Sequence, residues 1–515
     1  MKRLFLVITA LLVLVLGSLS CAPSAPPAEE TPPPAPEVTP SPSPPSFQPT
    51  IFGDGEVLVT FEVKVPEWTP EEDKIYVYTD GYQPVDSAGI PMEKKEINVW
   101  SVAFLAPKNQ ELRYKYNRNS YGFATDEEFT PDSKEKRHSI MVGTEPIFVQ
   151  DEVKKWRWLT EQPPQAIVST FRPDKLPERE EPFIVGIFTL DFFDLVFADF
   201  MPSVFDRIKE KGFKYVGIAY APLSFISGKP LKFSREPINT YTDEQLAYTI
   251  AEARKRGLKI VLSAGIETDP GNFDKIEAEF IKEQSDEWYR ELAKEWEDVM
   301  VETAKLAEKY EIEIFTPSDQ WFVWGNKTED QKKMLNPLIN KAYQSIRAVY
   351  SGKISSDNYS PDEAFDYYKQ LDWIGDKWWR AIADKKETNI DEMKAESERI
   401  IDDIYRPIYE KYKKPIFIQQ LAYASYDGAA GALQISTEGP EVGEWFPYNP
   451  EYPADFQEQA DAYEAVFQAI YDESIFVGAF SFSYTYWDSY DKSAGIRGKP
   501  AEEVWVKWNL IFSEK

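Results

Sequence analysis

From residue 182 onward, the chain alternates short apolar runs with longer segments whose apolar residues recur at helical spacing. The run at 182–190 has no polar alternation, as in a strand buried on both faces. Helical spacing follows Thr242, and Gln245 stands where a capping box places it. Eight strands separated by helices predict an α/β fold, a parallel (β/α)8 TIM barrel over 182–515. The predicted strands are 182–190, 213–225, 258–267, 311–321, 352–359, 371–379, 413–425 and 475–487.

A second pattern, polar residues alternating with apolar ones in short runs, occupies residues 51–150. The runs recur about every ten residues and are separated by Pro, Gly and Asp, which is typical of a small antiparallel β-sandwich. They lie at 55–65, 73–81, 96–106, 111–118 and 138–143. Residues 151–181, which are polar and contain prolines, are interpreted as a connector between this sandwich and the barrel.

The first 21 residues, MKRLFLVITALLVLVLGSLSC, have a basic start, an apolar run too short to span a bilayer comfortably, and small residues before Cys21. They resemble a bacterial lipoprotein signal peptide, 1–20, which implies lipidation of Cys21. An ordinary signal peptide is the alternative. The proline-rich stretch 21–50 predicts an extended tether. The expected location is therefore the bacterial cell surface or the periplasmic side of a membrane, with the membrane contacted through Cys21.

The composition of the chain excludes several kinds of partner and catalytic site. The net charge of −29 disfavours contact with phosphate backbones, so no nucleic-acid partner is expected. The chain has one histidine, His138, and one cysteine, which excludes Ser-His-Asp triads and histidine-based metal sites. We therefore expect no metal and no cofactor. Aromatic residues make up 15% of the chain, which fits either a sugar-binding surface or a large aromatic core.

Polar residues gather where the predicted strands end, which is where TIM barrels carry their active sites. Acids and aromatic rings around one mouth suit an uncharged polysaccharide or oligosaccharide. For any one of these residues, a role in a solvated loop or a helix cap is the alternative. The strand-end residues are Asp191, Glu267, Asp269, Asp319, Gln320, Asp357, Asp376, Gln419, Gln420, Trp487 and Asp488. The rings expected to stack on a sugar are Trp321, Trp378, Trp379 and Trp487.

The sandwich segment resembles starch-binding modules of carbohydrate-binding module family 20. The similar pieces are VTFEVKV at 59–65, KIYVYTDG at 74–81, and Trp100 followed by LRYKY at 112–116. The resemblance implies starch binding, with Trp100, Tyr114 and Tyr116 as candidate rings, although strand alternation predicts that some of them are core residues. A sandwich that only packs against the barrel is the alternative.

The barrel segment resembles the clan A glycoside hydrolases, most nearly family 113, which is known for endo-mannanase activity. The similar phrases include ARKRGLKIVLSAGIE at 253–267, SIRAVYSGKISSDNY at 345–359, LDWIGDKWW at 371–379 and VGAFSFSYTYW at 477–487. The family mechanism uses a glutamate ending the fourth strand as the acid and another ending the seventh as the nucleophile. The resemblance places the acid position on Gln320, or on Asp319 if the register slips by one. It places the nucleophile position on Gln420.

An amide cannot form a glycosyl ester or protonate a leaving group, but it can bind hydroxyls. The sequence therefore favours a surface lipoprotein that binds sugar in a catalytically silent barrel. An active glycosidase that uses Asp319 with Glu267 or Asp488 is the second hypothesis. A structural or adhesive role is the third. We also expect Gln420 to share the inner face of its strand with Ile416 and Ile418.

Overall fold

The computed structural model divides into two compact units, one within Pro23–Pro163 and one within Pro164–Lys515. The structure describes residues 55–79, 89–119, 127, 137–157, 159–162, 165, 167–189, 195–228, 231–235, 241–268, 282–319, 322, 327–357, 365–384, 388–431, 453–484 and 490–513.

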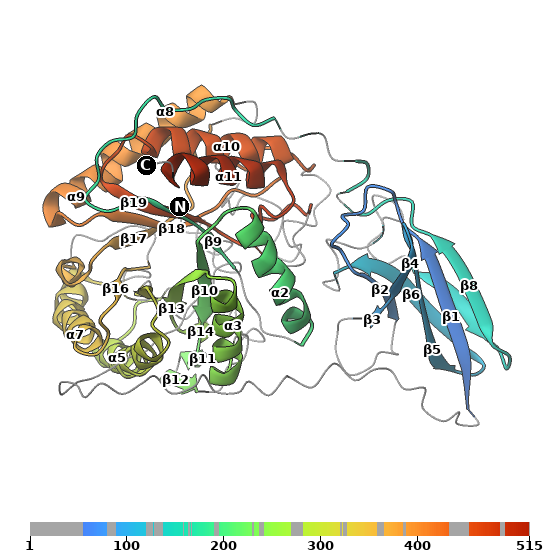
Figure 1. The fold of residues 1–515 in the computed structure, drawn as a ribbon. Coiled ribbons are helices and arrows are strands. Elements are labelled where there is room, and N and C mark those ends of the chain that lie inside the picture. Colours follow the sequence, from blue (N-terminus) through green and yellow to red (C-terminus); the bar gives the residue numbers. More distant parts are fainter. Residues whose placement is uncertain are drawn as a thin grey trace, which may run out of the picture. The chain divides into compact units, whose positions relative to one another are not determined.

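The larger unit is built on an eight-stranded parallel sheet, and each predicted strand segment contributes one strand (Figure 1). In spatial order the strands are β16 (Lys353–Ile354), β15 (Ile314–Pro317), β13 (Lys259–Ala264), β10 (Tyr215–Tyr220), β9 (Ile184–Phe188), β19 (Phe476–Ser481), β18 (Ile416–Leu421) and β17 (Ile374–Trp378). The two outermost strands meet: the backbone N–H of Asp372 donates to Ile354 O (2.9 Å), and that of Gly375 donates to Ser356 Oγ (3.0 Å). The predicted (β/α)8 barrel is confirmed.

Helices follow most of these strands and form the outer layer of the barrel (Figure 1). They are α2 (Leu195–Glu210), α3 (Asp243–Lys255), α5 (Asp286–Lys309), α7 (Glu329–Arg347), α8 (Ile390–Ile400), α9 (Arg406–Tyr412), α10 (Phe456–Ile470) and α11 (Pro500–Ser513). The capping box at Thr242 is present, because its hydroxyl accepts from Gln245 N (3.2 Å) and the Gln245 side chain accepts from Thr242 N (2.7 Å). Beyond β10 and β13, a small sheet orders β12 (Leu231–Ser234), β11 (Ser224–Gly228) and β14 (Glu267–Thr268).

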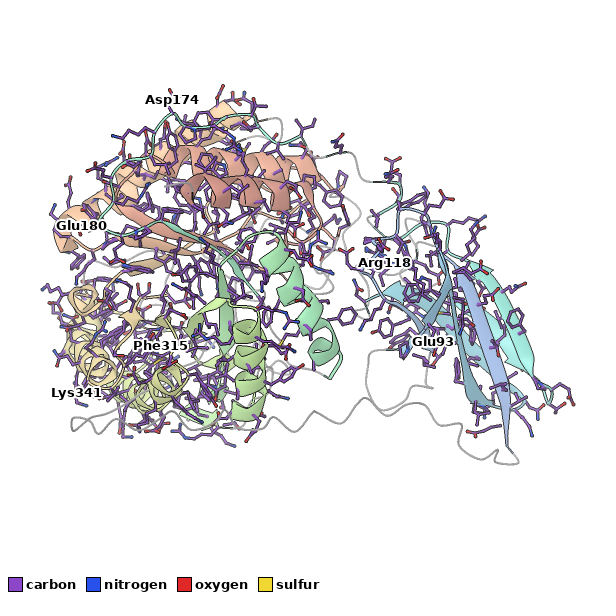
Figure 2. All side chains as sticks on the ribbon, viewed as in Figure 1. Glu93, Arg118, Asp174, Glu180, Phe315 and Lys341 are labelled. Atoms are coloured by element: carbon purple, nitrogen blue, oxygen red, sulfur yellow. The ribbon has the colours of Figure 1, made fainter. Side chains whose placement is uncertain are left out.

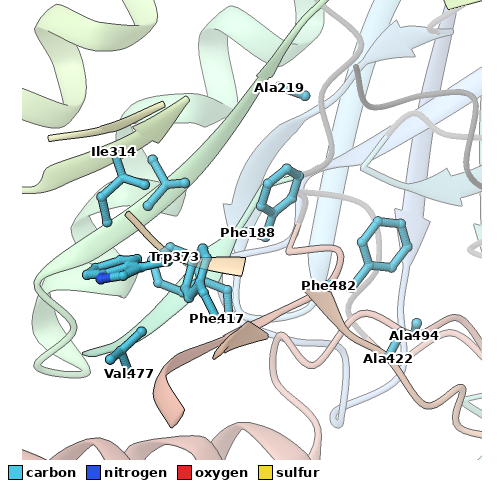
Figure 3. Packing of buried hydrophobic residues seen from close by; sticks show 11 residues of the cluster. Phe188, Ala219, Ile314, Trp373, Phe417, Ala422, Val477, Phe482 and Ala494 are labelled. Atoms are coloured by element: carbon cyan, nitrogen blue, oxygen red, sulfur yellow. The ribbon is translucent and has the colours of Figure 1, made fainter. Parts of the chain in front are cut away.

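Aromatic side chains fill the barrel interior (Figure 3). The Phe417 ring lies 5.3 Å from that of Phe480 and 5.5 Å from that of Trp373, measured between centroids. Glycines make the room for these rings, since a Cβ on Gly186 would lie 2.3 Å from the Phe480 ring and one on Gly217 would lie 2.2 Å from the Phe188 ring. Phe480 and Phe188 thus each face a glycine on a neighbouring strand, which gives the dense packing that protein interiors require.

One turn of π-helix, η3 (Ile401–Tyr405), joins α8 to α9 in the outer layer. It presents Tyr405 to β17, where the Tyr405 ring stacks on Trp378 at 5.3 Å and 17°. The Tyr405 hydroxyl donates to Asp376 Oδ2 (2.5 Å), as does the Arg380 guanidinium (2.7 Å). Asp376 and Trp378 therefore face the helices rather than the barrel axis.

The connector lies along the barrel helices over 167–181. Lys507 of α11 donates to Ser169 O (3.0 Å), and Arg179 donates to carbonyls beyond the end of α10, including Tyr471 O (2.7 Å) and Phe476 O (3.2 Å). The Phe171 ring contacts Tyr471 at 5.5 Å between centroids. The compact unit accordingly begins near residue 164, ahead of the predicted barrel boundary at 182.

The smaller unit contains two four-stranded sheets. One orders β4 (Glu93–Glu96), β5 (Val99–Pro107), β1 (Glu56–Lys64) and β8 (Ile147–Glu152), and the other orders β3 (Ile90–Pro91), β2 (Ile75–Thr79), β6 (Gln110–Arg118) and β7 (His138–Val142). The sheets share a core in which the Phe61 ring meets the Tyr114 ring at 4.7 Å. Arg118, labelled in Figure 2, is fully buried and pairs with Asp73 at 2.6 Å.

Among the described residues, no helix combines the length and the apolar character needed to cross a membrane.

Candidate functional site

Four neighbouring strands carry polar side chains at or just beyond their carboxyl ends, the position of active sites in TIM barrels. They are Asp319 after β15, Asp357 after β16, Lys377 in β17 and Gln420 in β18. All four side chains are fully buried. The structure thus brings together three residues that the sequence predicted, and it adds Lys377.

Asp357 and Lys377 form a buried ion pair, with Lys377 Nζ 3.0 Å from Asp357 Oδ1. Burial raises the pKa of Asp357 to about 7, although the charge of Lys377 opposes the shift. Burial also lowers the pKa of Lys377, against the attraction of Asp357 and Asp319. Each partner stabilises the charged form of the other in a place where neither charge is hydrated.

Asp319 is held by the outer helices. Tyr343 of α7 donates its hydroxyl to Asp319 Oδ2 (3.1 Å), and the Tyr367 ring stacks on Tyr343 at 5.1 Å and 7°. Burial first, and then the charge of Asp319, raise the pKa values of both tyrosines. Asp319 is therefore directed toward α7, which disfavours it as the acid that faces a substrate.

The seventh barrel strand, β18, contains an irregularity that changes which residues face inward. In its pairing with β17, Ile418 is opposite Asp376 and Gln420 is opposite Lys377, so that Gln419 is an extra residue. Phe417 lies in the interior cluster, and Gln419 Nε2 donates across the barrel to Ser263 Oγ of β13 (2.7 Å). The prediction that Ile416 and Ile418 share an inner face with Gln420 is therefore wrong. Phe417 and Gln419 face inward, so Ile416 and Ile418 lie on the other face, and simple alternation cannot anticipate the bulge between Ile418 and Gln420.

After the bulge, Gln420 shares the register of Lys377, whose side chain is directed to Asp357. Both amide atoms of Gln420, and Oε1 of Gln419, are buried without a hydrogen-bond partner among the described residues. The same holds for Thr316 Oγ1 of β15 and Ser481 Oγ of β19. Buried polar atoms are normally satisfied, so a set of such atoms at one end of a barrel indicates a place for a polar ligand or for water.

The tryptophans expected at the mouth divide into two kinds. Trp378 is fully buried against Tyr405, and its Nε1 donates to Tyr423 Oη (2.9 Å), so it offers no face to a sugar. Trp379 is only partly buried, and its ring meets Phe482 edge-on at 4.5 Å. Of the described rings, Trp378 cannot stack on a sugar, and the stacking role of Trp379 stays a prediction.

Several predicted site residues lie outside the described part of the chain. They are Cys21, Asp191, Asp269, Gln320, Trp321, Trp487 and Asp488. Glu267 lies in β14, and only its backbone is described.

The rings proposed for starch binding are core residues of the smaller unit. Trp100 is 9% exposed, Tyr114 2% and Tyr116 0%. Both tyrosine hydroxyls donate to Asp151 Oδ2 (2.8 Å each). A sugar needs an open ring face, so the assignment of these three rings to sugar binding is corrected: they pack the unit.

Sequence reasoning missed Lys377, Ser263 and Tyr343. The available signal for Lys377 was a lysine in LDWIGDKWW, a segment predicted as a barrel strand, because a buried lysine requires a partner. The cross-barrel contact of Ser263 and the helix contact of Tyr343 depend on tertiary packing and left no sequence signal.

Fold and site together define a (β/α)8 barrel whose strand ends form one polar centre. The model of Glycoside Hydrolase Family 113 matches residues 201–497, more than half of the chain, and the chain belongs to this family.

Among solved structures, the GH113 β-mannanase AaManA from Alicyclobacillus acidocaldarius in complex with ManMIm is similar at 18% identity, with a TM-score of 0.49, over 65% of this chain and 99% of that chain. A GH113 β-1,4-mannanase is similar at 17% identity, with a TM-score of 0.47, over 65% of this chain and 100% of that chain. The endo-1,4-β-D-mannanase from Thermotoga petrophila RKU-1 is 12% identical, with a TM-score of 0.40, over 64% and 99% of the two chains. No curated protein sequence matches the chain.

Proposed function

We propose that this member of glycoside hydrolase family 113 binds a neutral glycan at its barrel mouth and does not hydrolyse it by the retaining mechanism. The observation that carries the proposal is the end of β18, where two consecutive buried side chains are amides, Gln419 and Gln420. The retaining mechanism requires a carboxylate nucleophile at this strand end. Whether Gln419 or Gln420 is aligned with the nucleophile of the family, the residue at that position is an amide.

The same amides support glycan binding. A glutamine offers two donors and two acceptor lone pairs, which match the alternating donor and acceptor character of sugar hydroxyls. The amide of Gln420 is buried without a partner among the described residues, and such a group is costly unless a ligand or water pairs with it. Trp379 adds a partly open aromatic face to the same end of the barrel.

The test combines hydrolysis and binding. The full chain is incubated with β-mannan and with soluble α-glucan, and reducing ends are counted. Binding of mannan-derived and glucan-derived oligosaccharides is then measured by calorimetry. We expect binding without new reducing ends. Gln420→Ala should weaken binding, whereas Gln110→Ala, an exposed glutamine of the smaller unit, should not. Hydrolysis by the wild type that is lost in Asp319→Asn would instead make Asp319 the acid and the glutamines substrate contacts.

For the smaller unit, we propose a β-sandwich module that binds starch-like glycan. Since Trp100, Tyr114 and Tyr116 are buried, the binding residues must be others. Electrophoresis of the chain in gels that contain soluble starch or mannan tests the module. Unchanged mobility of both the full chain and a 51–150 fragment would leave the module only a packing role.

For the amino-terminal region, we propose lipidation at Cys21 and display at the cell surface or the periplasmic side of a membrane. The support is the sequence MKRLFLVITALLVLVLGSLSC and the proline-rich stretch after it. Mass spectrometry of the mature amino terminus should find a lipid-modified Cys21, and Cys21→Ser should release the protein from membranes. A mature chain that starts elsewhere and carries no lipid would contradict the proposal.

A further inference from the structure

Lys377 has a position and surroundings that glycan binding alone does not require. It is the next-to-last residue of β17, the sixth barrel strand, at the end where barrel chemistry occurs. Its side chain is fully buried, and its Nζ lies 3.0 Å from Asp357 Oδ1. An amine with a carboxylate at hydrogen-bonding distance has a proton acceptor beside it.

The neighbouring strand places a hydroxyl-binding group beside the lysine. Gln420 is opposite Lys377 in the pairing of β17 and β18, so the two side chains leave adjacent backbones in the same register. The Gln420 amide is buried and has no partner among the described residues. The amine thus comes from β17, the proton carrier from the segment just after β16, and the hydroxyl-binding amide from β18.

We propose that Lys377 is a nucleophilic amine that forms an imine with the aldehyde of a carbohydrate's reducing end. The ligand class rests on the proposed glycan binding; the covalent step is additional to it. Lysines removed from water are the ones that carry carbonyl chemistry, because burial disfavours the ammonium ion. The lowered pKa of Lys377 is consistent with this.

The step balances without an oxidant or a reductant. Asp357 accepts a proton from the Lys377 ammonium, and the free amine attacks the aldehyde carbon of the open-chain sugar to form a C–N bond. Asp357 relays one proton from the nitrogen to the former aldehyde oxygen, which gives the neutral carbinolamine, and the proton that it took from the ammonium is then donated to the carbinolamine hydroxyl. The C–O bond then breaks, water leaves, and the C=N bond remains. Gln420 would hold a hydroxyl of the same sugar during these steps.

The experiment traps the imine in the full-length protein. The chain is incubated with mannotriose and cyanoborohydride, and adducts are located by mass spectrometry of its peptides. A trapped adduct adds the mass of the trisaccharide less one oxygen. Mannotriitol, whose reducing end is an alcohol, is the matched ligand that cannot react. We expect labelling of Lys377 that saturates with ligand and exceeds that of the exposed Lys294 of α5, because the ligand is held beside Lys377 and burial lowers the pKa of its amine.

Two results would overturn the proposal: labelling confined to surface lysines, or labelling of Lys377 that does not saturate. The wild type alone decides this, so the experiment does not depend on a variant that folds. Lys377→Arg, which keeps the charge beside Asp357, should abolish the saturable adduct. If mannotriitol and mannotriose bind equally and no adduct forms, the imine fails and the glycan-binding proposal stands. If neither sugar binds, the glycan-binding proposal fails as well.

Discussion

Gln420 differs from glutamate only in an amino group where the acid has an oxygen, yet that exchange removes both the charge and the nucleophile. A carboxylate in its place would be buried next to Lys377 in the strand register. Burial would raise the pKa of that carboxyl, and the charge of Lys377 would lower it. A Gln420→Glu variant therefore tests whether the site can still set the pKa of a catalytic carboxyl.

We predict that Gln420→Glu alone does not hydrolyse β-mannan, because the family resemblance places an amide, Gln320, at the position of the acid. The double variant Gln320→Glu, Gln420→Glu should show trace activity, measured as reducing ends over long incubation. Gln110→Glu, on the surface of the smaller unit, is the control for an added charge. Full activity from Gln420→Glu by itself would show that an acid is already in place.

The ion pair of Asp357 with Lys377 makes a second prediction at this scale. Lys377→Met leaves the Asp357 carboxylate buried without its partner, which should lower the free energy of unfolding by about 3–5 kcal/mol. Adding Asp357→Asn should restore most of that loss, since a neutral pair leaves no buried charge. Urea unfolding measures all three proteins, with Lys294→Met as an exposed lysine control. Equal stabilities of the single and double variants would contradict the pairing.

At the scale of elements, the sequence predicted those features that depend on residues close together in the chain. The capping box at Thr242 was predicted because a cap involves residues only three positions apart. The bulge in β18 was missed because it is a property of two paired strands. Helix α11 was not predicted. Trp378 and Trp379 could not be assigned from sequence to the outer layer or the mouth, because a ring suits either.

The connector yields a prediction at the element scale. Arg179 donates to carbonyls at the end of α10 and the start of β19, Tyr471 O (2.7 Å) and Phe476 O (3.2 Å). Arg179→Ala should lower the free energy of unfolding of the barrel by about 2 kcal/mol, as expected for lost charge-assisted hydrogen bonds. Arg399→Ala, an exposed arginine of α8 that pairs only with nearby helix acids, is the matched control. A barrel transition equal to that of the wild type would mean that the connector is not part of the cooperative unit.

At the scale of the whole molecule, the two compact units carry different titrating groups. His138, the chain's only histidine, lies in the smaller unit, where its Nε2 is 3.0 Å from Glu127 Oε2 and its ring stacks on Tyr114. Asp151 and the Tyr116 hydroxyl also face this group. Burial alone would lower the pKa of His138, but the hydrogen bond and charge of Glu127 outweigh it, and the pKa is raised.

A raised histidine pKa stabilises the folded unit below the unfolded value of about 6.5, and this contribution is lost as the pH rises through the folded value. We predict that the melting temperature of the smaller unit, measured by calorimetry, decreases as the pH rises from about 5.5 to about 8.5. His138→Gln should remove this dependence. The barrel transition should respond to pH equally in both proteins, because Asp357, with a pKa of about 7, belongs to the barrel. If the melting temperature of the smaller unit still decreases with pH in His138→Gln, groups other than His138 cause the decrease.

Because Ile401–Tyr405 is a π turn, the fold depends on the number of residues in this segment and not only on which residues they are. Removing one residue there would allow an unbroken α-helix but would rotate everything after it by about 100° relative to α8. The Tyr405 hydroxyl would then leave Asp376, and the ring would leave Trp378. This segment should therefore accept many substitutions on its solvent side and no single-residue deletion.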